Sequence, residues 1–269
     1  MSSDKSISAG GVDEKGYIIN PCSLANIQSS FSSPVEQACD GLLKLFKDKI
    51  HSIYLYGSIA RGDAIEGRSD LDMSVVFIEK PIFDLKPRFR ILEGELLQHF
   101  PQIVKVDFDP GTLAEVLAKD SEYTWQFWLK HSCCCVWGTD LSMSIPDYHP
   151  SSQIGYMMNR ELADKLAFER QQLTQKNAAV IGVKVAKQLL RTFYYLLSDH
   201  HKHWEHDPEQ CARVVANFRP ECASNIHKVL QIWHDPAMTE QDVHWLIDVF
   251  GEQVCRELET VAQKYGFYS

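Results

Sequence analysis

A Gly-Ser turn that follows one apolar strand and precedes a pair of aspartates constrains the fold of this chain most strongly. Residues 53–56 form a short apolar and aromatic run that ends at Gly57, which is typical of a buried strand entering a tight turn. Gly57 lets the backbone approach a ligand closely, and Ser58 supplies a hydroxyl and an N–H group at the first turn of a helix. Because such N–H groups favour anions, the pattern predicts a seat for phosphate oxygens.

Asp70 and Asp72 form the second part of the pattern. They lie two residues apart where a second apolar strand, predicted over 72–77, begins. Side chains alternate along a strand, so both carboxylates are expected on one face. Magnesium prefers oxygen ligands and usually binds through one or two carboxylates together with substrate phosphates. The phosphate seat and the aspartate pair are therefore expected to work as one unit.

A third carboxylate is expected from the strand-like segment 103–109, which a Pro-Gly pair ends. Asp107 and Asp109 share one face of this strand. Asp107 is the better candidate for a metal ligand because it lies inside the strand between two apolar residues. Asp109 adjoins the Pro-Gly pair and is instead a candidate cap for a helix that starts near Thr112.

These motifs together resemble the signature of the DNA polymerase β-like nucleotidyltransferase superfamily, over about residues 50–110. The spacer 59–69 is one residue longer than the commonest form of the family. The resemblance implies Mg²⁺-dependent transfer of a nucleoside monophosphate, with two Mg²⁺ ions and ATP as the expected nucleotide. It assigns phosphate binding to Gly57 and Ser58, and both catalysis and metal binding to Asp70, Asp72 and Asp107.

The rest of the chain resembles antibiotic nucleotidyltransferases with a helical C-terminal domain, of the streptomycin and spectinomycin adenylyltransferase type. The likeness rests on 136–141, on Ile145-Pro146, on an apolar helix ending near Tyr195, and on 212–220 before another helix. It implies transfer of AMP to a hydroxyl of an aminoglycoside-like acceptor, release of pyrophosphate and a role in antibiotic resistance. That family also places a lysine near the triphosphate, for which Lys202 is a candidate.

The predicted fold class is α+β: a polymerase β-like nucleotidyltransferase domain with a mixed sheet flanked by helices, followed by an all-α domain. We predict a flexible tail over 1–16, the nucleotidyltransferase domain over 17–146, a linker over 144–152 and the helical domain over 153–269. Apolar periodicity and turn residues predict further elements: helices over 34–50, 89–100 and 112–131, a strand over 133–137, and helices over 155–198 (with a break near 177), 208–217, 221–233 and 239–264.

Two groups of basic side chains are candidates for contacts with phosphate. Arg61 follows the Gly-Ser turn directly, although a salt bridge with Asp63 or Asp70 is the alternative. In the second domain a basic stripe lies three and four residues apart, on one side of a helix. If these side chains contact the phosphates of the nucleotide, the second domain closes the nucleotide site. The alternative is an exposed helix face that binds no ligand. The stripe consists of Lys184, Lys187 and Arg191.

The composition limits the classes of partner and compartment. The 269 residues carry a net charge of −9, which argues against nucleic acid as a partner and suits a cationic small molecule. We find no apolar run of about 20 residues and no signal peptide, so a cytoplasmic protein without a membrane partner is expected. The sequence indicates no particular oligomeric state.

Cysteine and histidine clusters carry less information. The eight cysteines lack CxxC spacing and are expected to be reduced thiols. The run 133–135 would alternate between the faces of a strand, which favours small packed side chains over a metal site. The histidine-rich stretch 200–206 matches no zinc motif, so we interpret it as a polar interdomain loop.

The sequence leaves two other functions open. A nucleotidyltransferase that modifies a protein side chain would carry the same carboxylates as one that modifies a small molecule. A catalytically silent interaction module, such as an antitoxin partner, is a third possibility, and the intact Asp70, Asp72 and Asp107 count against it.

Overall fold

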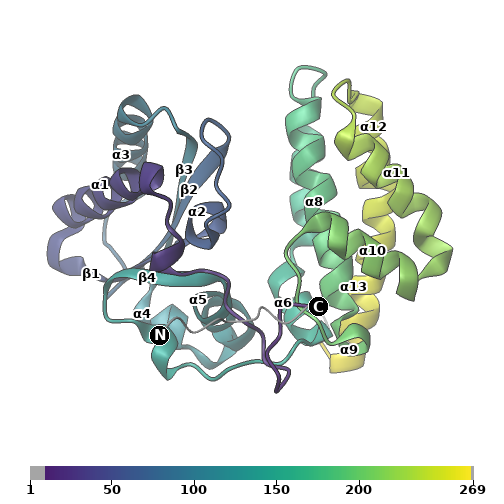
Figure 1. The fold of residues 1–269 in the computed structure, drawn as a ribbon, viewed down its shortest axis with the longest axis horizontal. Coiled ribbons are helices and arrows are strands. Elements are labelled where there is room, and N and C mark those ends of the chain that lie inside the picture. The colour runs from purple at the N-terminus through teal and green to yellow at the C-terminus, as the bar shows by residue number, and fades with distance from the viewer. Residues whose placement is uncertain (1–9, 268–269) are drawn as a thin grey trace. The chain divides into compact units, whose positions relative to one another are not determined.

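The computed structural model describes residues 10–267, which divide into two compact units. One unit comprises residues 19–147 and contains the sheet (Figure 1). The other combines residues 10–18 with 148–267 and is helical. The division after Asp147 falls inside the segment predicted as a linker, 144–152.

The first unit is built on a mixed four-stranded sheet in the order β3-β2-β1-β4. β1 is antiparallel to both β2 and β4, whereas β2 and β3 are parallel. A parallel pair needs a crossover, which the helix α3 supplies between these two strands. The strands are β1 (Ile50–Tyr56), β2 (Ser69–Phe77), β3 (Ile103–Thr112) and β4 (Cys133–Gly138).

One face of this sheet forms the core of the first unit. Its apolar residues, such as Leu55 and Met73, are fully buried in one cluster with side chains of α1 (Ser29–Phe46) and α3 (Lys86–His99). The two helices contact each other at Gly41, where a Cβ would collide with Leu92. Because side chains alternate, the other face carries the three aspartates of the motifs, together with buried residues such as Tyr54 and Val76. Short helices complete the unit: η1 (Leu24–Asn26), η2 (Lys47–Lys49), α2 (Gly57–Arg61) and η5 (Leu141–Ser144).

The structure corrects the sequence-based prediction around residues 109–131. β3 does not end at the Pro-Gly pair but continues to Thr112, because β3 is an edge strand, where a missing N–H group is tolerated. The side chain of Thr112, not that of Asp109, caps the next helix. The single helix predicted over 112–131 is interrupted, since Ala118 is extended (φ −62°, ψ 144°). It is replaced by α4 (Leu113–Leu117), η3 (Lys119–Ser121), the π-helical turn η4 (Glu122–Gln126) and α5 (Phe127–Ser132).

The second unit is a bundle arranged around α8 (Ala178–Leu196), which packs against most of the other helices of the unit. α8 begins directly after Asn177, where the sequence predicted a break, and a further interruption lies at 160–161. No helix in the described part of the chain is both long and apolar enough to cross a membrane. The other elements are α6 (Ser152–Asn159), α7 (Leu162–Gln172), α9 (Ser198–His201), α10 (Pro208–Phe218), η6 (Pro220–Cys222), α11 (Ala223–His234), α12 (Glu240–Trp245), the π-helical η7 (Leu246–Gly251) and α13 (Glu252–Tyr265).

The N-terminal segment differs from the predicted flexible tail. Residues 1–9 of that tail lie outside the described part of the chain. Residues 10–18, in contrast, pack within the helical unit. The backbone N–H of Trp204 donates to the carbonyl of Gly10 at 2.7 Å, and the ring of Tyr17 stacks on His149 with centroids 4.1 Å apart. The structure therefore places residues 10–16 in specific contacts where the sequence predicted a free tail.

Candidate active site

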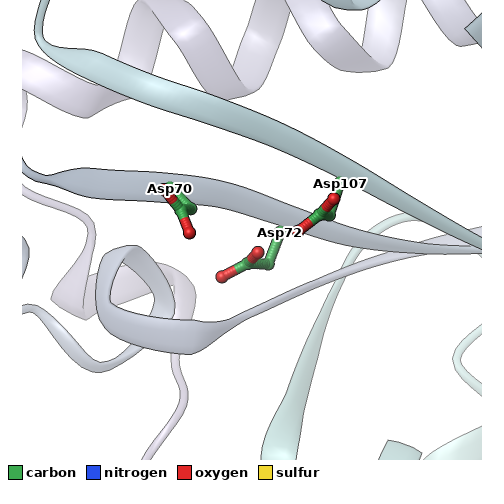
Figure 2. A group of neighbouring side chains, drawn as sticks. All are labelled: Asp70, Asp72 and Asp107. Carbon is green, nitrogen blue, oxygen red and sulfur yellow. The ribbon is translucent and has the colours of Figure 1, made fainter. Parts of the chain in front are cut away.

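Three aspartates meet on the face of the sheet opposite the one that packs against α1 and α3. β2 supplies Asp70 and Asp72, and β3 supplies Asp107, which lies directly opposite Asp72 in the parallel register. One carboxylate oxygen from each residue can be chosen so that all three lie within 4.8 Å of one another (Figure 2). No other group of three metal-binding side chains this close occurs among residues 10–267. The alternation of two strands thus brings together the three carboxylates that the sequence singled out.

Gly57 brings the backbone against this cluster. It adopts a left-handed conformation (φ 77°), and a Cβ at this position would collide with Oδ2 of Asp72. Only glycine fits such an approach without strain. The following residue, Ser58, lies in α2, the short helix that starts at Gly57. The backbone segment predicted to bind phosphate therefore lies directly beside the Asp72 carboxylate.

The electrostatics of the cluster favour a bound cation. Burial, followed by the charges of Asp70 and Asp107, raises the pKa of Asp72 to about 7. Burial also raises the pKa of Asp70, and the positive charge of Lys105 partly offsets this increase. A divalent ion would relieve this repulsion, and carboxylate oxygens are the ligands that Mg²⁺ prefers. The residues present therefore fit a magnesium site.

Lys105 is a member of the cluster that the sequence reasoning missed. Its ammonium group forms an ion pair with the carboxylate of Asp107. The spacing Lys105–Asp107 is the same two-residue spacing that placed Asp70 beside Asp72, so the strand pattern already contained the signal.

Asp109 lies on the same face of β3 but has a different environment. It accepts a hydrogen bond from the hydroxyl of Tyr56. The ring of Tyr56 packs edge-on against Trp128 with centroids 5.0 Å apart, and Trp128 Nε1 donates to the hydroxyl of Ser74 at 3.4 Å. Asp109 therefore belongs to an aromatic and polar patch beside the cluster, and the helix cap considered for it is not formed.

Arg61 adopts the alternative arrangement that the sequence left open. Its Nε lies 3.2 Å from Oδ2 of Asp63, in an ion pair at the end of α2. A contact between Arg61 and phosphate stays a prediction, because it requires the guanidinium to leave this partner.

The basic stripe of α8 is engaged within the helical unit. Lys184 Nζ lies 2.5 Å from a carboxylate oxygen of Glu169. Lys187 lies over the ring of Trp233, with Nζ 5.5 Å from the centroid, and burial together with the charge of Arg191 lowers its pKa. Arg191 donates to the carbonyl of His206 at 2.8 Å. Lys202 ends α9 in a left-handed conformation (φ 56°). The triphosphate contacts predicted for the stripe and for Lys202 stay predictions.

The structure gives the burial of the cysteines and of the histidine-rich stretch, and the chemical state of the thiols. All eight cysteines lie in the described part of the chain and are free thiols. Cys133 is buried, whereas its two neighbours in β4 are half-buried. In the histidine-rich stretch His201 is buried, and its Nε2 lies 3.0 Å from the carbonyl oxygen of Tyr194.

Comparison with known proteins identifies the class. Residues 35–109 match the family described as a nucleotidyltransferase domain. This stretch contains every motif residue discussed above, from Gly57 to Asp107. Residues 35–109 are therefore a nucleotidyltransferase domain, and the chain is an enzyme of the nucleotidyltransferase class.

A solved structure extends the likeness to both units. The chain is similar to spectinomycin adenyltransferase AAD(9) from Enterococcus faecialis, determined with ATP and spectinomycin, with a TM-score of 0.54 and 14% sequence identity. The likeness covers 82% of this chain and 98% of that one. It confirms the predicted fold class, a nucleotidyltransferase domain followed by a helical region. A search of curated proteins finds no match to the chain.

Proposed function

We propose that this protein is a Mg²⁺-dependent adenylyltransferase that transfers AMP from ATP to a hydroxyl of a small molecule and releases pyrophosphate. One observation carries the proposal: three carboxylates on neighbouring strands, with ligand atoms within 4.8 Å, lie inside a matched nucleotidyltransferase domain. Such a cluster suits the phosphoryl chemistry of this class because the substrate brings negative charge that carboxylate-bound metal ions neutralise.

In this mechanism each part of the site has a separate task. The N–H groups at Gly57 and Ser58 hold phosphate oxygens, and Asp70 and Asp72 would hold Mg²⁺, with Asp107 as a third ligand. Mg²⁺, when bound, supplies Lewis-acid neutralisation of charge on the triphosphate. Asp107 accepts the proton of the acceptor hydroxyl as its oxygen bonds to the α-phosphorus. The bond from that phosphorus to the bridging oxygen breaks, and the electron pair leaves with pyrophosphate.

We propose an aminoglycoside-like acceptor, and with it a role in antibiotic resistance in the cytoplasm. The similar solved structure contains ATP and spectinomycin, and its likeness to this chain includes the helical unit. The net charge of −9 also favours a cationic acceptor over nucleic acid.

The test is pyrophosphate release with Mg²⁺ and each of ATP, GTP, CTP and UTP against a panel of aminoglycosides that includes spectinomycin and streptomycin. We expect release that requires both ATP and an acceptor, and that Asp70→Asn abolishes. Asp48→Asn, an exposed site in η2, is the matched control and should behave as wild type. Retention of more than about a tenth of the wild-type rate in Asp70→Asn would overturn the catalytic assignment, because losing a metal ligand should cost several kcal/mol.

A second outcome would change the proposed acceptor but leave the nucleotide site as assigned. If no small molecule supports release but Mg-ATP still binds, the acceptor class is wrong. Labelling of protein side chains with AMP would then identify a protein-modifying enzyme. Binding of ATP with no transfer to any acceptor would favour the interaction module.

A further inference from the structure

Lys105 gives the carboxylate cluster a cation that belongs to the chain itself. It lies on β3 two residues before Asp107, so both side chains project from the same face of the strand. Its ammonium group forms an ion pair with the Asp107 carboxylate and also acts electrostatically on Asp70 and Asp72. Among residues 10–267, no other lysine or arginine forms an ion pair with any of the three aspartates. Lys105 is therefore the counter-ion that the chain supplies to the cluster.

A metal ion and this ammonium group need the same carboxylate. An ion held by all three aspartates contacts an oxygen of Asp107, at about 2 Å if the ion is Mg²⁺. The ammonium group is bonded to that same carboxylate. When the ion binds, the ammonium group either leaves Asp107 or stays beside a second cation, and like charges this close repel each other. Either outcome weakens the binding of the ion.

The exposure of the pair limits the size of this effect. The side chains of Lys105 and Asp107 are 59% and 39% exposed, so the ammonium group can move into solvent when an ion displaces it. Ion pairs this accessible are weak, since water screens them and both side chains lose freedom when they pair. The ammonium group therefore competes with the ion for the site but does not block it.

We propose that Lys105 competes with the metal ion for Asp107 and so lowers the affinity of the cluster for an ion that binds without nucleotide. Lys105 is then a positioning residue, which holds Asp107 when the protein carries no metal ion. The proposal concerns the protein without nucleotide, because the phosphates of a nucleotide add negative charge of their own. It rests on the proposed function in one respect, namely that the cluster is a metal site.

The first experiment measures the affinity for Mn²⁺, in place of Mg²⁺, without nucleotide. Electron paramagnetic resonance detects the free ion. We expect Lys105→Met to bind Mn²⁺ about threefold to tenfold more tightly than the wild type. Lys105→Arg keeps the positive charge and should bind as the wild type does. Lys80→Met removes a lysine charge at an exposed position of the same unit, so it controls for net charge and should also match the wild type.

A second measurement distinguishes competition from a lysine that only supports the fold. In urea unfolding without metal, Lys105→Met should be less stable than the wild type, because the three carboxylates lose their counter-ion. At one fixed Mn²⁺ concentration it should gain more stability than the wild type does, since a tighter ligand stabilises the folded state more. A lysine with only a structural role would lower the stability equally with and without Mn²⁺.

The outcomes separate this inference from the proposed function. Equal or weaker Mn²⁺ binding by Lys105→Met, or an equal rise in affinity in Lys80→Met, would overturn the competition and leave the proposed function standing. The same holds if Mn²⁺ binds only in the presence of α,β-methylene-ATP, in the wild type and in Lys105→Met alike. No binding of Mn²⁺ in any form, with or without α,β-methylene-ATP, would overturn both.

Discussion

Asp72 of the sheet unit and Asp199 of the helical unit are both shielded carboxylates, but their surroundings are opposite. Burial alone would raise the pKa of Asp199, yet hydrogen bonds from Lys264 and Ser152 outweigh it and lower the pKa to about 2. Lys264 Nζ and the hydroxyl of Tyr265 lie 2.6 and 3.2 Å from Oδ2 of Asp199. At Asp72, burial and neighbouring carboxylates act in the same direction and raise the pKa to about 7.

The difference separates a carboxylate with partners in the chain from one that we propose binds a metal ion. The chain itself neutralises Asp199, which ties α9 to α6 and α13. Asp72, in contrast, gains most of its stabilisation only when a cation arrives from outside. Perturbed carboxylates of the second kind mark functional sites.

The largest effect is expected from Asp72→Asn. The substitution keeps the shape of the side chain but removes a metal ligand, so turnover should fall by about a thousandfold or more. The metal-free fold should be no less stable, because the change also removes charge repulsion. Steady-state rates and thermal unfolding of the same preparation measure the two effects. Loss of activity that is caused only by unfolding would contradict the role proposed for Asp72 as a metal ligand.

Gly57→Ala should have the next largest effect. Alanine in a left-handed conformation costs about 1–2 kcal/mol, and its Cβ would also collide with Asp72. We expect lower stability in urea unfolding together with weaker binding of Mg-ATP. Gly94→Ala is the matched control: it lies in α3 with open space around it, and should raise stability by up to about 1 kcal/mol with activity unchanged. Equal behaviour of the two variants would contradict the proposed close approach.

Asp199→Asn should show the reverse of Asp72→Asn. Loss of charged hydrogen bonds should lower the free energy of unfolding by about 1–3 kcal/mol while the transfer rate stays at the wild-type value. Urea unfolding checks the first part and pyrophosphate release the second. Glu259→Gln, an exposed site on α13, should change stability by less than about 0.5 kcal/mol. Unchanged stability in Asp199→Asn would remove the structural role assigned to this residue.

The smallest effect is a dependence of metal affinity on pH. Because the pKa of Asp72 is raised to about 7, a proton competes with Mg²⁺ below that pH, so the affinity should fall by up to about tenfold per pH unit between 7 and 6 and level off above 7. Asp199, with its pKa at about 2, stays ionised throughout and should contribute nothing. Calorimetric titration with Mg²⁺ measures the slope. A Mg²⁺ affinity that stays constant between pH 7 and 6 would contradict the competition between the proton of Asp72 and the metal ion.

The sequence predicted the grouping of the three carboxylates better than the elements around them, for a physical reason. The side-chain period of a strand is two residues, so Asp70, Asp72 and Asp107 were assigned to their faces without knowledge of the tertiary structure. Lys105 also follows this period, two residues before Asp107, but nothing in the residue pattern shows that its ammonium group pairs with that carboxylate.

Elements that depend on neighbours were predicted less well. The break at Ala118 follows no glycine or proline, so periodicity alone continued the helix through it. The continuation of β3 through Pro110 depends on its place at the edge of the sheet, which is a property of the tertiary structure. Residues 10–16 were predicted as a free tail because their contacts, such as Gly10 with Trp204, join segments far apart in the sequence.

The most direct test of the account is calorimetric binding of ATP with Mg²⁺ and with EDTA, for the wild type, Asp72→Asn and Asp199→Asn. We predict that the wild type and Asp199→Asn bind ATP only when Mg²⁺ is present, and that Asp72→Asn loses this binding. Equal ATP affinity with Mg²⁺ and with EDTA, or normal Mg²⁺-dependent binding by Asp72→Asn, would contradict the claim that the carboxylate cluster is a metal–nucleotide site.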